Sequence, residues 1–405
     1  MNSIDLLITN AEELITLQGP NHPRIINEMN ELGIIRHGML AIDDGKIVDV
    51  GTDLEYNAKK VIDATGKIVT PGFIDPHTHL VFGGSREFEL DWKLHGLSYM
   101  DIKKKGGGID YTVSHTRKDS FESLYQQSKR RLDTMLTYGT TTCEAKSGYG
   151  LNVETEQRIL DIQNQLNKDH TVDIISTFLG AHAIPKEMSD EEYVDLVINE
   201  MIPIAQNRAQ FCDVFCEKGF FSVDQSKRIL EAGKKAGLIP KIHADELVDT
   251  GGGMLAAEVG AISAEHLLKT NEESMKKMAE KQVIGVMLPG TPFSLMMNEY
   301  APARTMIDTG VPISLATDLN PNCYVENMQF MMQLACFNME MTPSEALTAA
   351  TFNAACAIKQ QDLIGSLEIG KQADVIVLDV SNYQMIPYHF GINHVNTVIK
   401  KGEIV

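Results

Sequence analysis

The chain has 405 residues, of which 43% are hydrophobic, and a formal net charge of −19 at pH 7. This composition excludes an intrinsically disordered protein, and the length suffices for one large α/β barrel with a small second domain or for two ordinary domains. The negative charge argues against nucleic acid or an anionic membrane as a partner, because such a surface repels a polyanion. A small anionic substrate remains compatible with it, since one local arginine can dominate a pocket.

The cysteines and the N-terminus both indicate a cytoplasmic protein. The six cysteines include no Cys-x-x-Cys pair and lie mostly in apolar segments, as free buried thiols do. The N-terminus lacks a basic segment followed by an apolar core, and no apolar run approaches membrane-spanning length. We therefore expect a reducing compartment.

Both ends of the chain are predicted to be β structure. Residues 1–66 contain short apolar runs, and Asp43-Asp44-Gly45-Lys46 predicts a tight hairpin because its glycine admits a positive φ. Residues 366–405 return to this pattern, with an apolar run over residues 375–379. We expect the two ends to form one small β-sandwich around a middle segment of residues 67–365. The alternative is two unrelated β extensions.

The middle of the chain alternates between strand-like and amphipathic segments. The expected strands span residues 68–76, 141–146, 173–181, 211–217, 239–245, 261–266, 283–288 and 311–318. The expected helices between them include residues 121–136, 155–166, 191–201, 224–236, 252–259 and 272–280. Eight strands with helical crossovers favour a closed parallel (β/α)8 barrel over an open sheet.

The first crossover, from Leu80 to Thr140, is long and contains Lys103-Lys104-Lys105-Gly106-Gly107-Gly108. Three consecutive glycines predict a mobile loop. A mobile loop above a barrel mouth is a natural lid over a site. A plain flexible surface loop is the alternative.

The first barrel strand ends in two histidines that are one residue apart. Because side chains alternate along a strand, His77 and His79 are expected on the same side, within reach of one ion. Neutral imidazole suits a zinc-like or iron-like metal. A chance pair of surface histidines is the alternative.

Other predicted strand ends also carry ionisable groups, which parallel strands would bring to one end of a barrel. In chain order these groups are Lys146, His182, Glu217 with Lys218, His243 with Asp245 and Glu246, His266, and Asp318. Three imidazoles and a carboxylate, from His77, His79, His243 and Asp318, would hold a divalent ion and leave a position for water. Such an ion lowers the pKa of its water from about 15.7 towards about 7. Asp318, His266 and Glu246 are the candidates for accepting and returning the proton.

This arrangement resembles the amidohydrolase superfamily over nearly the whole chain. The stretches that carry the resemblance are residues 75–87, 146–151 (Lys-Ser-Gly-Tyr-Gly-Leu), 178–185, 243–246, 263–267 and 316–321. The resemblance implies a distorted (β/α)8 barrel with a β-sandwich made from both termini. It is strongest to the branch that hydrolyses the cyclic amide of 4-imidazolone-5-propanoate to N-formimidoyl-L-glutamate in histidine degradation.

Residue roles follow from the same resemblance. It implies metal ligands at His77, His79, His243 and Asp318, and one divalent or trivalent ion, zinc or iron, in each subunit of a homodimer. It implies substrate contacts from Arg86, Tyr149, His182 and Glu246, with Asn320, Asn322 and Cys323 beside the product.

The chemistry of these residues agrees with the implied roles. Arg86 can hold a propanoate carboxylate through two parallel hydrogen bonds, although a structural arginine is the alternative. Tyr149 and His182 can bond a small polar ring or the same carboxylate. Glu246 can orient the water or a ring nitrogen, or it can merely position His243. His266 can stabilise an oxyanion or carry a proton, unless it is simply buried.

Two stretches depart from the superfamily. Binuclear members use a carboxylated lysine at the end of strand four, where this chain has Cys216-Glu217-Lys218, so we expect one metal ion. Lys146, at the end of strand two, is expected to be a structural or electrostatic partner. Asn322 and Cys323 stand where the family often has smaller residues. Their expected contacts with the product would be retained despite this difference if they are made through the backbone.

Two rival functions remain. An aminohydrolase acting on another nitrogen heterocycle would share the metal site but would not need Arg86 for a carboxylate. A non-catalytic scaffold would have lost metal ligands, whereas all four are present in this sequence.

Overall fold

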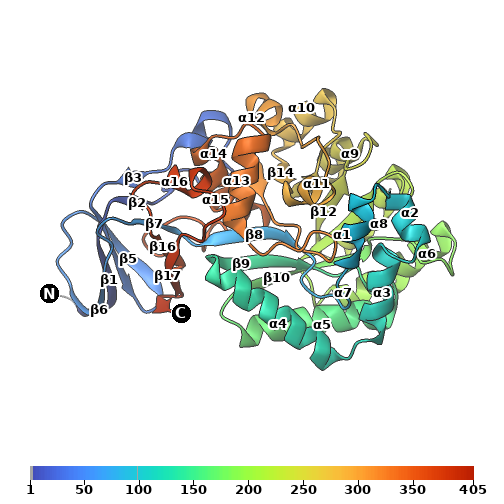
Figure 1. Ribbon diagram of the computed structural model, residues 1–405, viewed down its shortest axis with the longest axis horizontal. Helices are drawn as coiled ribbons and strands as arrows, with labels where there is room; N and C mark the ends of the chain where they lie inside the picture. The colour runs from blue at the N-terminus through green and yellow to red at the C-terminus, as the bar shows by residue number, and fades with distance from the viewer. Residues whose placement is uncertain (1–2, 98) are drawn as a thin grey trace.

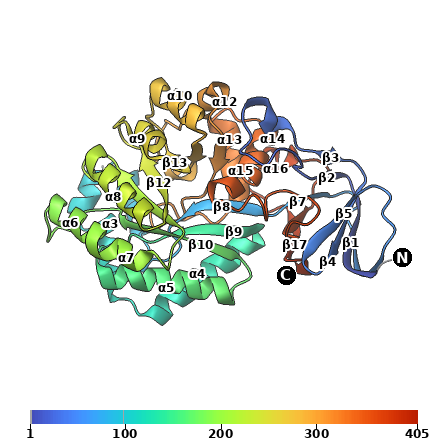
Figure 2. The same cartoon turned by 180° about the vertical axis from the view of Figure 1, so that it is seen from behind.

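The computed structural model describes residues 3–97 and 99–405 and divides into a β-sandwich and a barrel (Figure 1). Both chain ends lie in the sandwich, at one side of the molecule, and the barrel with its helices forms the other side. The same arrangement is seen from behind in Figure 2. The predicted fold class, a (β/α)8-type barrel with a sandwich from both termini, is confirmed.

The sandwich consists of two sheets. The four-stranded sheet has the order β5 (Lys46–Gly51), β4 (Gly38–Asp43), β1 (Ser3–Ala11) and β6 (Asn57–Asp63). The six-stranded sheet has the order β18 (Glu403–Ile404), β17 (Val395–Lys400), β16 (Val375–Leu378), β7 (Ile68–Pro71), β2 (Glu13–Ile15) and β3 (Ile34–Ile35). Leu6 and Leu40 from one sheet and Val375 and Ile399 from the other share one buried core. This shared apolar core joins the two ends of the chain.

The predicted strand over residues 68–76 is wrong as a single strand. It consists of β7, which pairs with β16 and β2 in the sandwich, and β8 (Phe73–Thr78), which begins the barrel. The chain changes sheets at Gly72, where an added Cβ would lie 2.3 Å from Oγ1 of Thr141. The periodicity of the sequence could not reveal this change, because both strands are buried at every position. The predicted division of the chain at residues 66/67 and 365/366 stays a prediction.

The barrel sheet contains eight parallel strands in sequence order. After β8 come β9 (Thr140–Lys146), β10 (Asp173–Ala181), β11 (Phe211–Cys216), β12 (Ile239–Ala244), β13 (Ser263–His266), β14 (Ile284–Met287) and β15 (Ile313–Leu315). The sheet closes just past β15 through two backbone hydrogen bonds. The amide of His79 donates to the carbonyl of Leu319 (2.8 Å), and the amide of Asp318 donates to the carbonyl of His77 (3.1 Å). Closure therefore brings the first and last strand ends together.

Helices cover the barrel, and among them are those predicted over residues 121–136, 155–166, 224–236, 252–259 and 272–280. The helices are α4 (Phe121–Thr137), α5 (Val153–Asp169), α6 (Asp190–Leu196), α7 (Ile202–Ala205), α8 (Val223–Lys235), α9 (Gly252–Val259), α10 (Glu272–Lys281), α11 (Gly290–Ser294), α12 (Ala303–Thr309), α13 (Met328–Asn338), α14 (Pro343–Ala349), α15 (Phe352–Ala357) and, near the sandwich, α16 (Met385–Tyr388). A π-helical turn (Val197–Met201) separates α6 from α7. Pro203, in the first turn of α7, has no N–H to donate, which favours this break in the helix predicted over residues 191–201.

The long first crossover contains α1 (Phe88–Leu94), α2 (Tyr99–Lys104) and α3 (Ile109–Lys118). The glycines between α2 and α3 are only partly exposed: Gly107 and Gly108 are buried, and the amide of Gly108 donates to Oε1 of Glu89 (2.7 Å). The side chain of Lys103, which belongs to the predicted loop, lies outside the described residues. A lid function for this segment stays a prediction.

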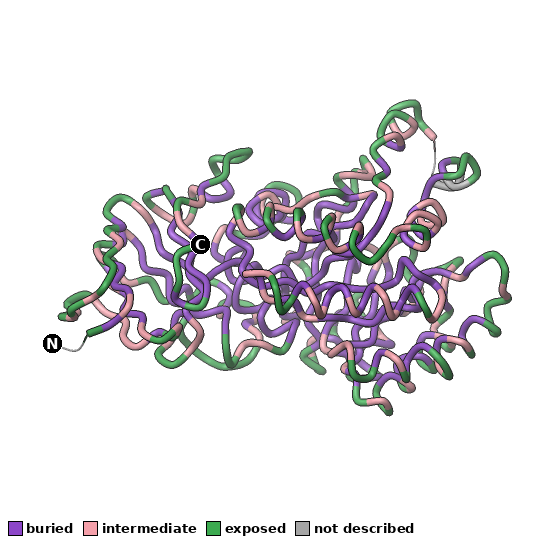
Figure 3. Tube along the Cα trace, turned by 90° about the horizontal axis from the view of Figure 1, so that it is seen from below, coloured by how far each residue is buried: buried purple, intermediate pink, exposed green. Residues whose placement is uncertain are grey.

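Burial is concentrated in the barrel strands and in the sandwich core, whereas turns and helix surfaces are exposed (Figure 3). All six cysteines are free, and five of them are buried, as predicted. Within the described residues, we find no helix that combines the length and the apolar character needed to cross a membrane.

We predict that Gly72→Ala destabilises the fold by about 1–3 kcal/mol, because the new methyl group overlaps Thr141 at the change of sheets. Urea unfolding followed by circular dichroism measures the loss. Thr141→Ala removes the two closest atoms, so the double variant should recover part of the stability. Equal stability of Gly72→Ala and the unmodified protein would contradict this prediction.

Candidate metal centre and active site

Four predicted ligands converge at the carboxyl end of the barrel. His77 and His79 extend from β8, His243 from β12, and Asp318 follows β15. Nitrogen atoms of the three histidines lie within 4.8 Å of one another. Oδ1 of Asp318 lies 3.4 Å from Nε2 of His77 and 3.6 Å from Nε2 of His79. The four side chains are buried and face one common point.

Unusual backbone conformations aim two of the groups at this point. His266 has a φ of 73° and Asp318 a φ of 53°, the left-handed region that residues other than glycine rarely adopt. Thr291, in α11, donates its hydroxyl to Oδ2 of Asp318 (2.5 Å). Asp318 is thereby held with Oδ1 towards the histidines. Hydrogen bonds and nearby positive groups, His77 first among them, outweigh burial and keep the pKa of Asp318 well below its usual value.

Buried carboxylates hold the far sides of two histidines. Nδ1 of His77 contacts Oε2 of Glu265, and Nδ1 of His243 lies 3.0 Å from Oδ2 of Asp213. Nζ of Lys146 lies between these carboxylates, 2.9 Å from Glu265 and 2.8 Å from Asp213. All five side chains are at most 3% exposed. A carboxylate behind each imidazole fixes the ring orientation and leaves Nε2 free to bind a cation.

The residues fit a bound divalent ion. Nε2 of His243 is buried without a hydrogen-bond partner, which is costly unless something binds it. Three imidazoles and one carboxylate match the ligand types and number of a catalytic zinc or iron site.

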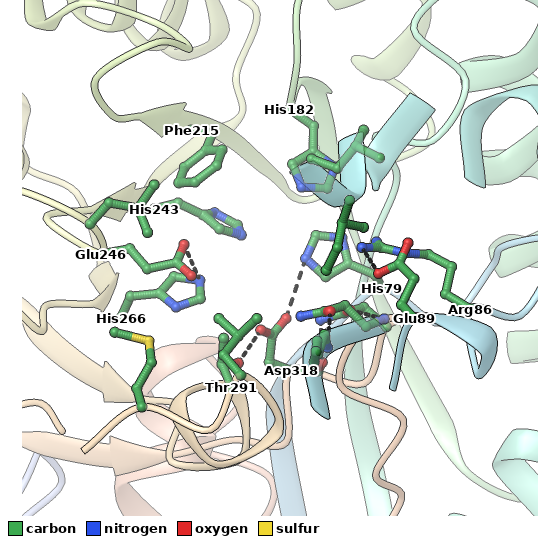
Figure 4. A pocket seen from close by; sticks show the side chains of 18 of the residues that line it. His79, Arg86, Glu89, His182, Phe215, His243, Glu246, His266, Thr291 and Asp318 are labelled. Carbon is green, nitrogen blue, oxygen red and sulfur yellow. Dashed lines mark hydrogen bonds and ion pairs between the residues drawn. The ribbon is translucent and has the colours of Figure 1, made fainter. Parts of the chain in front are cut away.

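His79, His243 and Asp318, three of the four predicted ligands, line a cavity of about 470 Å³ (Figure 4). The predicted residues that line it are His79, Arg86, Tyr149, His182, His243, Glu246, His266, Asp318, Asn320 and Asn322. Glu89, Lys93, Phe215, Phe220, Thr291, Leu295 and Met297 add to the wall. The volume suits a small ring with a short substituent.

Glu246 and His266 form a pair on the wall of this cavity. Their Oε2 and Nε2 atoms are 3.8 Å apart. Burial, followed by the charges of Asp318 and Glu217, raises the pKa of Glu246 to about 8. Burial lowers the pKa of His266 to about 3, although Asp318 opposes this shift. A carboxyl group with such a pKa can both accept and release a proton near neutral pH.

Tyr149 and His182 lie beside His79. The rings of His79 and His182 are stacked with centroids 4.8 Å apart, and the ring of Tyr149 is 5.2 Å from that of His182. Nδ1 of His182 is 3.1 Å from the carbonyl of Gly148. Burial lowers the pKa of His182 to about 3, so its ring is neutral and Nε2 can accept a hydrogen bond while Nδ1 donates.

Arg86 lies at the cavity wall, but its guanidinium already has a carboxylate partner. Nε and Nη2 donate to the two oxygens of Glu89, at 2.8 and 2.7 Å. Glu89 was not predicted as a partner of Arg86, although a spacing of three residues can bring two side chains together on a helix.

The three predicted residues after Asp318 are arranged differently. Asn320 and Asn322 line the cavity, and Oδ1 of Asn320 accepts the amides of Asn322 (2.7 Å) and Cys323 (3.0 Å). The side chain of Cys323 is buried instead, 3.7 Å from the carbonyl of Thr317. A turn closed by Asn320 thus points residue 322 into the cavity and residue 323 away from it.

Other side chains of the site were not identified from the sequence. For Asp213 there was a signal, since it is an acidic residue in the otherwise apolar run Phe211–Cys216. Glu265 directly precedes His266 and could have been recognised in the same way. Nothing in the local sequence marks Thr291 as a partner of Asp318.

We predict that Asp213→Asn weakens metal binding by about 10- to 100-fold, because the amide no longer fixes the orientation of His243. Competition with a chromogenic chelator measures the affinity without requiring turnover. The matched control is Asp161→Asn, whose carboxylate pairs with Arg208 at the surface. An unchanged metal affinity in correctly folded Asp213→Asn would contradict the proposed support of His243.

Comparison with known proteins identifies the family. Models described as "Amidohydrolase family" match residues 220–405 and 60–100. The imidazolonepropionase of Alkaliphilus metalliredigens strain QYMF is 54% identical, with 99% of this chain and 98% of that protein covered. The imidazolonepropionase of Geobacillus kaustophilus strain HTA426 is 53% identical, with 99% and 97% covered.

Solved structures with similar folds are more distant in sequence. A zinc-containing adenosine deaminase from Xanthomonas campestris superposes with a TM-score of 0.76 at 18% identity, covering 100% of this chain and 93% of that one. A triazine hydrolase variant gives a TM-score of 0.78 at 16% identity, covering 98% and 94%. At this level of identity the likeness supports the fold alone. The sequence relatives go further, and they show that this chain, a hydrolase of C–N bonds, belongs to the imidazolonepropionase family of amidohydrolases.

Proposed function

We propose that this protein hydrolyses the cyclic amide of 4-imidazolone-5-propanoate and releases N-formimidoyl-L-glutamate, a step in histidine degradation. The observation that carries the proposal is one cavity that combines a buried three-histidine, one-aspartate cluster with Arg86 at its wall. A metal ion held by this cluster can activate water, and Arg86 can interact with a carboxylate. The full-length similarity to curated imidazolonepropionases supports the same substrate.

His77, His79, His243 and Asp318 hold the metal ion in this proposal. When bound, a divalent ion supplies Lewis acidity and lowers the pKa of a coordinated water. Zinc and iron both accept this ligand set, and availability selects between them. A single ion fits best, because in the second cluster of potential ligands among the described residues, Asp213, His243 and Glu265, the two carboxylates already pair with the ammonium of Lys146.

Glu246 accepts the proton of the attacking water and His266 stabilises the charge that develops on the ring carbonyl oxygen. The raised pKa of Glu246 then suits it to return a proton to the departing ring nitrogen. The carboxylate of Asp318, fixed by Thr291, is the other possible proton acceptor.

Tyr149 and His182 orient the ring, while Arg86 and the asparagines 320 and 322 define the position of the propanoate. An aminohydrolase of another nitrogen heterocycle is the alternative. It has less support, because such a ring carries no carboxylate to place near Arg86.

We also propose a cellular setting for this reaction. Six free thiols favour a reducing cytoplasm. A homodimer that binds a small anionic substrate, without nucleic acid or a membrane as partner, agrees with the resemblance and with the net charge of −19.

The first test is turnover. We expect freshly prepared 4-imidazolone-5-propanoate to be converted to N-formimidoyl-L-glutamate, detected by mass spectrometry. Chelation should abolish the reaction, and zinc or iron should restore it, because the attacking water needs the ion. Conversion of a purine but not of the imidazolone by the metal-loaded protein would instead support the aminohydrolase alternative.

The second test concerns Glu246. We predict that Glu246→Gln lowers kcat by about 10²- to 10⁴-fold while metal content stays unchanged, since only the proton acceptor is lost. Only the ionised carboxylate accepts a proton, so kcat/KM of the unmodified protein should rise with pH through the pKa of Glu246. That limb of the profile should disappear in the variant. A kcat close to that of the unmodified protein would assign the proton to another group.

A further inference from the structure

Helix α1 places Glu89 and Lys93 at the cavity wall, whereas Leu90, Asp91 and Leu94 are exposed. Glu89 is 1% exposed, whereas Leu90 is 56% and Leu94 67% exposed. Glu89 and Lys93, four residues apart, lie on one face of α1, and Arg86 lies just before the helix; all three line the cavity. Burying charged groups is costly, so each of them needs a partner.

The pair formed by Arg86 and Glu89 contributes no net charge to the cavity. The side chains are 3% and 1% exposed, and Glu89 occupies the Nε and Nη2 side of the guanidinium. Glu89 also accepts the amide of Gly108, which fixes its position. Arg86 can therefore offer a ligand only the donors that Glu89 leaves free, chiefly those of Nη1.

Lys93 is the other cation at this wall of the cavity. Nζ donates to Oδ1 of Asn322 (2.7 Å) and, more weakly, to the carbonyl of Ser294 (3.4 Å). Among the lysine and arginine side chains that line the described part of the cavity, Lys93 has no carboxylate in ion-pair contact. An ammonium has three donors, so at least one remains for a ligand. Burial lowers the pKa of Lys93, and an anionic ligand would oppose that shift.

We propose that Lys93 is the residue that selects an anionic substrate, binding the substrate carboxylate together with Nη1 of Arg86. The pair of Arg86 and Glu89 then acts as a rigid, charge-neutral support. Lys93 supplies the positive charge that distinguishes a carboxylate from a neutral group of the same shape. The bond to Asn322 places the ammonium beside a residue expected to contact the product. This inference rests on the proposed function, because it assumes a carboxylate on the substrate.

The test compares two small probes on the metal-loaded protein, 3-(imidazol-4-yl)propanoate and its carboxamide. Isothermal titration gives the affinity of each probe, and their ratio measures the preference for negative charge. We expect Lys93→Met to reduce this ratio about tenfold, as for the loss of one charge-assisted hydrogen bond, by weakening binding of the carboxylate alone. Lys93→Arg, which retains the charge, should keep most of the preference.

The matched control is Lys105→Met, which removes an exposed lysine near the same helix, where its ammonium lies 4.5 Å from the ring of Trp92. Its ratio should equal that of the unmodified protein. An unchanged ratio in Lys93→Met, or equal loss of both probes, would overturn the inference. Hydrolysis of the imidazolone by the unmodified protein is measured separately. If it occurs while the ratio does not change in Lys93→Met, only the role of Lys93 fails.

Discussion

The carboxyl end of the barrel depends on a group of buried charges in which Lys146 lies among Glu144, Asp213 and Glu265. Burial alone would lower the pKa of Lys146, but the three carboxylates outweigh it and raise that pKa well above its usual value. Charges without solvent are tolerated only when they are paired in this way. Because Glu265 and Asp213 also contact His77 and His243, the same pairing that neutralises the barrel interior fixes the orientation of two proposed metal ligands.

The cavity beside this group of buried charges is built on two kinds of structural element. Its floor is built on the ends of barrel strands, where closure of the sheet holds His79 against Leu319 through a backbone hydrogen bond. Its wall is built on the long first crossover, where α1 places Glu89 and Lys93 at the cavity and leaves Leu90 and Leu94 exposed. Rigid strands suit a metal cluster, whose geometry is demanding. A helical insertion suits substrate selection, because its residues can vary without disturbing the barrel.

Much of the fold and of the metal cluster could be predicted because each depends on local patterns. Apolar runs of strand length, amphipathic segments between them and histidines at strand ends all have a direct physical meaning in a parallel barrel. The change of sheets at Gly72 could not be predicted, since both strands that it joins are buried at every position. The orientation of Cys323 depends on how Asn320 closes its turn, and the residue types alone do not specify this. The pairing of Arg86 with Glu89 required knowing that α1 turns Glu89 towards the cavity.

By itself, the sequence determined the alternation of strands and helices, the β character of both ends and the residues able to bind a metal ion. These properties follow from side-chain periodicity and from the chemistry of each residue type. Only the tertiary structure decided which side chains meet, because contacts such as Asp318 with His77, or Lys146 with Glu265, join residues more than one hundred positions apart. Such contacts arise when the barrel closes and water is excluded, and it is this exclusion that gives buried charges their strength.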